Sequence, residues 1–155
     1  MDHTLLRRAC AQFATGIAIA TVLDHEGSPH GMTINSFTSV SLDPPLVLIS
    51  VDAASNLLQL FEQGGQYGLS FLGQEQPDVS ARFARRGENR FDGTQWVAGV
   101  TGLPLIPGAL AHLECRIVNT VGVGDHVLLI AEVVSADIQG GKPLVYFGSG
   151  YRSLE

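Results

Sequence analysis

The longest regular pattern in the sequence is a pair of strand-like runs that a tight turn separates. The first, "ALAHLECRIVNTVGVG", covers 109–124, and the second, "HVLLIAEVVSADI", covers 126–138. Gly124 and Asp125 are residues typical of a hairpin turn. Parallel strands need a long crossover between them, so two strands joined this closely pair antiparallel. The sequence therefore predicts an antiparallel sheet built around this hairpin.

Shorter apolar runs rich in β-branched residues precede and follow the hairpin, with turn residues between them. Strands are predicted at "IAIATVLD", within 31–45, at "LVLISVD", at "YGLSFLG" and at "PLVYFGS". Short helices are predicted at "DHTLLRRACAQFA", "SNLLQLFEQ" and "PDVSARFARR", and 87–107 is expected to be a long irregular excursion. Because the strands do not alternate with helices, we expect an antiparallel closed barrel with short helices at its rim.

The first predicted helix is amphipathic. Asp2 is placed to cap it and Gly16 to end it. The residues on its apolar face are Leu5, Leu6, Ala9, Cys10 and Phe13. Cys10 and Cys115 lack the spacing of a redox or metal motif, so we expect both to be small core residues in a reducing compartment.

Composition narrows the class of protein. A chain of 155 residues is long enough to bury a core, so we expect a single domain over 1–155. The net charge of −6 argues against nucleic-acid binding, and no apolar run is long enough to span a membrane. We expect a cytoplasmic protein. Its mean hydropathy of +0.21 suggests that a second copy covers part of its apolar surface.

The segment "GMTINSFTSVSLDPP", 31–45, is dense in short hydrogen-bonding side chains. These are Thr33, Asn35, Ser36, Thr38, Ser39 and Ser41. A strand that only covers a core does not need so many, so we interpret the segment as a binding surface. Ser55 and Asn56 begin the second predicted helix, where Ser55 could cap the helix or the free N–H groups could hold a phosphate.

His126 follows the hairpin turn directly, where it could be merely solvated or functional. "VGVGDH" is no dinucleotide fingerprint, because it lacks the third glycine and a strand follows it. The histidines show neither HxH nor HExxH spacing, so a metal site has little support. "FGSGY" lacks the frame of a nucleophile elbow.

Two further clusters each have two interpretations. Arg82, Arg85, Arg86 and Arg90 could form a solvated face or a patch that steers anions. An aromatic and arginine cluster closes the sequence, and it could stack on a planar ligand or form a dimer seam. Its members are Tyr146, Phe147, Tyr151 and Arg152.

Taken in order, these segments resemble the flavin reductase-like family with the FMN-binding split barrel, the reductase components of two-component flavin-dependent monooxygenases. The resemblance covers nearly the whole chain. It runs through "FATGIAIATV", "GMTINSFTSVSLDPPLVLISV", "SNLL", "YGLSFL", "FARRGENRF", "GDHVLLIAEV" and "PLVYFGSGYRSL".

The resemblance implies a mainly β, antiparallel split barrel of Greek-key type that transfers hydride from NADH or NADPH to FMN or FAD. His126 would be the catalytic residue and would orient the nicotinamide. Tyr151 and Arg152 would complete the binding site for NAD(P)H. No metal is implied. The chain would form a homodimer and supply reduced flavin to a partner monooxygenase. The implied flavin-binding residues are Thr33, Asn35, Ser36, Ser39, Val40, Ser41, Ser55, Asn56, Arg90 and Phe91.

Three alternatives remain open at this point. The same fold could reduce a ferric complex or another acceptor, or it could carry electrons on a bound flavin without NAD(P)H turnover. A pyridoxamine-phosphate-oxidase-type enzyme is disfavoured, because no basic phosphate cradle is visible around Ser55. The residues do not decide between FMN and FAD, or between NADH and NADPH.

Overall fold

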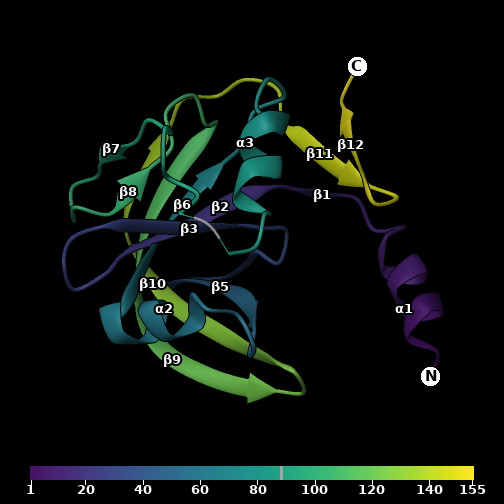
Figure 1. The fold of residues 1–155 in the computed structure, drawn as a ribbon, viewed down its shortest axis with the longest axis horizontal. Helices are drawn as coiled ribbons and strands as arrows, with labels where there is room; N and C mark the ends of the chain where they lie inside the picture. Colours follow the sequence, from purple (N-terminus) through teal and green to yellow (C-terminus); the bar gives the residue numbers. More distant parts are fainter. Residues whose placement is uncertain (88) are drawn as a thin grey trace.

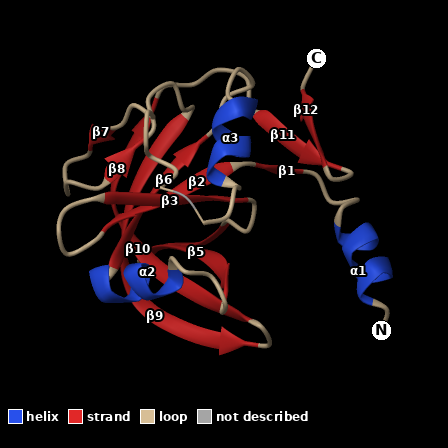
Figure 2. Cartoon of the chain, viewed as in Figure 1, coloured by secondary structure: helices blue, strands red, loops and turns tan. Residues whose placement is uncertain are grey.

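A computed structural model describes residues 1–87 and 89–155, and a curled antiparallel sheet forms its centre (Figure 1). Strands predominate, as Figure 2 shows, which confirms the predicted mainly β class. The strands of the main sheet are β2 (Ala18–Leu23), β3 (Pro29–Ile34), β4 (Thr38–Leu42), β5 (Pro45–Asp52), β6 (Gln66–Phe71), β9 (Ala111–Val123) and β10 (His126–Ile138). Their spatial order is β3-β2-β6-β9-β10-β5-β4.

Smaller elements surround this sheet. A second sheet has the order β1-β11-β12, and a two-stranded ribbon lies in the excursion. Their strands are β1 (Thr15–Gly16), β11 (Leu144–Phe147), β12 (Gly150–Ser153), β7 (Val97–Ala98) and β8 (Pro104–Leu105). The helices are α1 (His3–Cys10), α2 (Leu58–Gly64) and α3 (Pro77–Phe83). No helix in the described part of the chain is long and apolar enough to cross a membrane.

The predicted central hairpin is confirmed. Val123 and His126 face each other across the turn, and Gly124 adopts a φ of 58° that suits glycine. β9 also pairs with β6, and β10 also pairs with β5. The hairpin therefore joins the two halves of the sheet.

The hydroxyl-rich segment 31–45 was predicted as one strand, and this prediction is wrong. It forms β3 and β4, which are the two opposite edges of the sheet, and residues 35–37 connect them. Four peptide steps span at most roughly 14 Å, so the two edges must approach each other. The sheet therefore curls into a barrel whose open seam is crossed by 35–37.

Two apolar clusters hold the barrel together, and β2 belongs to both. Ala18, Ala20 and Val22 point into the barrel interior, whereas Ile17 and Ile19 pack in a second cluster with Leu72, Phe83, Phe91, Ile106 and Leu144. Successive side chains of a strand point to opposite faces. Because both faces of β2 are covered, its sequence is almost continuously apolar.

The first helix departs from its prediction. Asp2 caps it as expected, since its carboxylate accepts the Thr4 N–H at 2.8 Å. The helix ends at Cys10, however, and not near Gly16. α1 stands apart from the barrel in Figure 1, and none of its residues is buried. Its amphipathic pattern has no partner surface in the described part of the chain.

The two cysteines therefore differ. Cys10 lies on α1 and is exposed, so its prediction as a core residue is wrong. Cys115 is buried in the barrel interior, as predicted. Burial, with a smaller contribution from the charge of Glu114, raises the pKa of the Cys115 thiol to about 12.

The second helix begins later than predicted. α2 starts at Leu58, and no side chain caps it, so the prediction of Ser55 as its N-cap is wrong. The Ser55 hydroxyl instead accepts the Leu57 N–H at 3.3 Å, in the turn before the helix. The strands β1 and β12 were not predicted, because such short segments become strands only through pairing with β11.

A buried carboxylate anchors the excursion to the sheet. Glu114 on β9 is 3% exposed and accepts the N–H groups of Val100 at 3.1 Å and Thr101 at 2.9 Å. The Thr101 hydroxyl donates to the same carboxylate. These bonds hold the carboxylate directly over Gly99, where a Cβ atom would collide with it.

We therefore predict that Gly99→Ala destabilises the fold by about 1–3 kcal/mol, the usual cost of overpacking at a site that cannot relax. The carboxylate cannot retreat without losing its bonds to Val100 and Thr101. Gly122→Ala is the matched control, because nothing lies within 4 Å of its added Cβ. Urea unfolding measures both, and equal stabilities for the two variants would contradict this account of Glu114.

Candidate functional site

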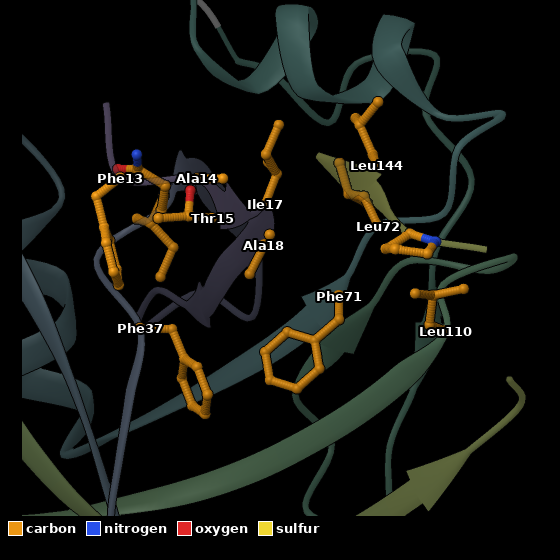
Figure 3. A pocket seen from close by; sticks show the side chains of 14 residues that line it. Phe13, Ala14, Thr15, Ile17, Ala18, Phe37, Phe71, Leu72, Leu110 and Leu144 are labelled. Carbon is orange, nitrogen blue, oxygen red and sulfur yellow. The ribbon is translucent and has the colours of Figure 1, made fainter. Parts of the chain in front are cut away.

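An apolar pocket of about 360 Å³ opens where 35–37 crosses the barrel seam. Figure 3 shows Phe37 and Phe71 along one side of it and Thr15 with Phe13 on another. The rings of Phe37 and Phe71 meet edge to face, with centroids 4.9 Å apart. The aliphatic lining is Ala14, Ile17, Ala18, Ile34, Leu72, Leu110, Pro143 and Leu144.

Two polar side chains also line this pocket, which we call the seam pocket. Asn35 is exposed at the crossing itself. The Thr15 hydroxyl oxygen is shielded from solvent and has no hydrogen-bond partner among the described residues. Buried polar groups are almost always bonded, and leaving one unsatisfied costs about 1–3 kcal/mol. The sequence prediction missed Thr15, because only the folded chain shows that its hydroxyl lacks a partner.

Two predicted flavin-binding side chains are already bonded within the fold. The Ser36 hydroxyl donates to the Ser50 carbonyl at 2.9 Å and accepts the Ser50 N–H at 3.1 Å. The Thr33 hydroxyl donates to the Ser80 carbonyl at 2.7 Å. These bonds fix the crossing segment against β5 and α3. Ser36 and Thr33 thus shape the site, and their hydroxyl protons are not free for a ligand.

The next three predicted residues lie on the edge strand β4. The register against β5 shifts between Ser39 and Ser41, which leaves Val40 between them with an exposure of 50%. Such an irregularity leaves backbone groups unpaired on an edge strand. Ser39, Val40 and Ser41 therefore offer backbone as well as side-chain groups beside the seam.

The structure brings His126 close to the Ser55–Asn56 turn. His126 pairs with Asp52 across β10 and β5, and the Ala53 N–H donates to the Asp125 carbonyl at 2.9 Å. Thus the hairpin turn and the chain leading to Ser55 are bonded side by side. Ser55 is half-buried and Asn56 is exposed.

His126 is itself oriented by its neighbour. Its Nδ1 lies 2.7 Å from Oδ1 of Asp125, and its side chain is 43% exposed. The hydrogen bond to His126, followed by the charge of its ring, lowers the pKa of the Asp125 carboxyl. With Nδ1 occupied, Nε2 is the ring nitrogen left to face a ligand.

The side chains of Arg90 and Phe91 make their contacts with other residues of the fold. The Arg90 guanidinium donates to the Gly31 carbonyl at 2.8 Å and the Arg85 carbonyl at 2.6 Å, and burial lowers its pKa. Phe91 is 5% exposed and packs edge to face on Phe83, with centroids 4.8 Å apart. These contacts hold the excursion on β3. The side chain of Phe91 is part of the second apolar cluster and presents no free face.

Within one chain, the residues predicted to bind NAD(P)H fall into two separate groups. The Tyr151 hydroxyl lies 2.9 Å from the hydroxyl of Ser80, and Arg152 donates to the Tyr151 carbonyl at 2.9 Å. Ser80, which the sequence prediction missed, thereby links Tyr151 to Thr33. His126 is not part of this group: Figure 1 places the β9–β10 turn well away from β12.

The site as a whole suits a planar ring with a polar edge. The seam pocket provides apolar and aromatic walls, and Asn35 provides hydrogen-bonding groups at the crossing. The described residues contain no cluster of three or more His, Cys, Asp or Glu side chains that could hold a metal ion.

Comparison with known proteins agrees with this geometry. A family model described as "Flavin reductase like domain" matches residues 10–155. The chain is 40% identical over 154 residues to an NADH-dependent flavin reductase from Pseudomonas fluorescens, covering 97% of this chain and 89% of that protein.

Two solved structures share the fold over nearly the whole chain. The styrene monooxygenase flavin reductase of Pseudomonas putida is 42% identical with a TM-score of 0.90, covering 96% of each chain. An NADH:FAD oxidoreductase of Streptomyces globisporus, solved in complex with NAD and FAD fragments, is 38% identical with a TM-score of 0.94. That match covers 99% of this chain and 93% of the other.

The contact between His126 and Asp125 predicts a measurable change in titration. In His126→Ala the pKa of the Asp125 carboxyl should rise toward its ordinary value of 3.8, because its hydrogen bond and its cationic neighbour are gone. Because the pKa of the Asp125 carboxyl is lowered in the folded protein, its ionised form stabilises the fold at pH values above the ordinary pKa. That stabilisation is lost as the pH falls through the lowered pKa of the folded state.

Carboxyl NMR titration measures this shift directly. Asp24, whose pKa is lowered mainly by its hydrogen bond to His30, is the internal control and should not move. An unchanged Asp125 pKa in the variant would show that the two side chains do not interact in solution.

Proposed function

The chain belongs to the flavin reductase-like family, and on that premise we propose that it transfers hydride from NADH to FMN or FAD. The observation that carries the proposal is the seam pocket, whose polar edge lies on the segment that the family resemblance assigns to flavin. Relatives named as NADH-dependent flavin reductases support the same activity. We take the whole of 1–155 as one functional unit.

The residues of the seam pocket fit a flavin ring. Its volume of about 360 Å³ falls within the range of small-molecule sites. Phe37 and Phe71 supply flat apolar contacts, and Asn35 supplies both a donor and an acceptor for the ring edge.

The protein's part in the reaction is to bind, orient and exclude water. A bound flavin supplies the hydride-accepting chemistry, so the chain needs no nucleophile of its own. Asn35 and the β4 backbone orient the ring, and the apolar walls keep water from one face. Ser55 and Asn56 hold a phosphate through their turn. His126, fixed by Asp125, orients the nicotinamide through Nε2. Holding the two reactants in a fixed orientation supplies much of the rate acceleration of hydride transfer.

A second copy and a partner enzyme complete the proposal. The apolar residues of α1 are exposed, with Leu5 at 56% and Leu6 at 49%, and Phe13, just after the helix, is exposed at 79%. An exposed apolar helix face marks an interface. We propose that α1 packs on the other subunit of a homodimer. Reduced flavin then passes to a monooxygenase, as the name of the Pseudomonas putida relative indicates for that protein.

The decisive experiment follows NADH oxidation at 340 nm with added FMN, FAD or riboflavin. The wild type should turn over in a flavin-dependent manner. Asn35→Ala should weaken flavin binding roughly fivefold to tenfold, which corresponds to one lost hydrogen bond. His126→Ala should lower kcat by about tenfold while flavin affinity stays unchanged, because it acts on the nicotinamide.

Two outcomes would change the assignment. If the protein binds flavin but neither NADH nor NADPH reduces that flavin, the protein would be an electron carrier. Loss of flavin binding in His126→Ala would mean that His126 belongs to the flavin side of the site.

The proposed dimer has its own test by sedimentation velocity. Leu6→Glu should shift the protein toward monomer, because it buries a charge in the interface. Thr4→Glu adds the same charge on the opposite side of α1, by helical spacing, and should remain dimeric. A wild type that sediments as a monomer, or a Leu6→Glu variant that stays dimeric, would refute this use of α1.

A further inference from the structure

A second pocket, of about 660 Å³, lies between the β7–β8 ribbon and the β9–β10 hairpin, and we call it the ribbon pocket. Figure 1 shows the ribbon on the side of the barrel away from α1 and β12. None of the residues that line the ribbon pocket also lines the seam pocket. The proposed hydride transfer makes no use of it.

The pocket exists because the excursion is bonded to three neighbouring strands and stops short of the fourth. On β2 the Thr21 hydroxyl donates to the Pro104 carbonyl, and on β6 the Ser70 hydroxyl accepts the Ile106 N–H at 2.9 Å. On β9 the Nε2 of His112 lies 2.7 Å from the Ile106 carbonyl oxygen. Among the described residues, the excursion makes no such bond to β10. A hollow therefore remains over the last part of that strand.

Four polar side chains of β9 and β10 line this hollow. His112 pairs with Asp137 across the two strands, and Glu114 pairs with Ser135. The two members on each strand are two residues apart, so they point to the same face of the sheet. All four belong to the lining of the ribbon pocket.

The lining is rich in hydrogen-bond acceptors and negative in charge. It contains the carboxylates of Glu114 and Asp137, and no lysine or arginine is among the described residues that line it. His112 donates to a carbonyl through Nε2, so Nδ1 of the neutral ring is an acceptor. The Gln139 amide donates to one Asp137 oxygen at 2.6 Å and orients that carboxylate. Because Asp137 is exposed, its remaining lone pairs are open to a ligand.

The other walls are apolar. Val97 and Val100 of the excursion are 51% and 82% exposed, and Leu105, Pro107 and Ala109 continue the same lining. The volume falls within the range of small-molecule sites. In the described part of the chain, no group of three or more His, Cys, Asp or Glu side chains could hold a metal ion. The negative charge beside apolar walls therefore suits an organic cation.

We propose that the ribbon pocket binds a small organic cation that carries an amidinium or guanidinium group on an apolar body. The charged group donates to the Asp137 carboxylate, since a planar pair of N–H groups matches the two oxygens of a carboxylate. The buried carboxylate of Glu114 adds to the negative potential without touching the ligand, because it is 3% exposed and bonded to the excursion. The apolar body lies against Val97, Val100 and Leu105.

Benzamidine is the probe, and benzamide is its neutral counterpart of nearly the same shape. Both are titrated into the full-length protein, and the backbone amide signals are followed by NMR. Asp137→Asn removes the charge and keeps an acceptor for Gln139. Asp92→Asn is the matched control, because Asp92 is also exposed but lies outside the ribbon pocket. The measurement needs neither flavin nor NADH, so its outcome is independent of the proposed function.

Benzamidine should bind with a dissociation constant of about 1 mM or tighter, and benzamide at least about tenfold more weakly. The amide signals that shift should be those of 97–100, His112 and Gln139, while those of Asn35 and Phe37 in the seam pocket stay in place. Asp137→Asn should weaken benzamidine about tenfold and melt like the wild type, because only the charge is lost. Asp92→Asn should bind benzamidine within about twofold of the wild type.

Four results would overturn the proposal. The first is no binding of benzamidine at about 10 mM, roughly ten times the expected dissociation constant. The second is equal affinity for benzamide, which would make the pocket apolar in its preference. The third is a set of shifted signals at Asn35 and Phe37 in place of the ribbon pocket. The last is equal weakening by Asp92→Asn and Asp137→Asn, which would mean that the probe responds only to the net charge of the protein.

Discussion

The short connection 35–37 is the constraint from which the shape of the site follows. It joins β3 and β4, which are opposite edges of a seven-stranded sheet, so the sheet has to curl until its edges nearly meet. The crossing leaves a seam rather than a continuous ladder. Asn35 and Phe37 lie in that seam by necessity, and the seam pocket forms beneath them. The position of the pocket is thus a consequence of how the barrel closes.

The polar groups around the seam divide into those that hold the fold and those that remain for a ligand. Ser36 and Thr33 bond to β5 and α3 and keep the crossing in place. Asn35 lies exposed in the pocket, and Thr15 has no partner within the described chain. A site that must be rigid and also bind needs both kinds of group. Two of the segment's hydroxyl groups are therefore used by the fold, and its other polar groups are not.

The long hairpin of β9 and β10 carries His126, the residue proposed to orient the nicotinamide. Its turn places His126 and Asp125 beside the approach to Ser55, through strand pairing with β5. Tyr151 instead is tied through Ser80 to the β3 side of the barrel. The proposed nucleotide residues of one chain therefore face different regions.

Local patterns in the sequence were sufficient for the central hairpin, the mainly β class and the family. The period of the apolar residues and the turn residues Gly124 and Asp125 predicted the central hairpin correctly, because both signals depend on neighbouring residues. Only the tertiary structure decided which side chains have partners. It moved Cys10 to the surface, bonded Ser36 inside the fold and left Thr15 without a bond. A side chain's partner comes from strands distant in the sequence, and no local pattern encodes it.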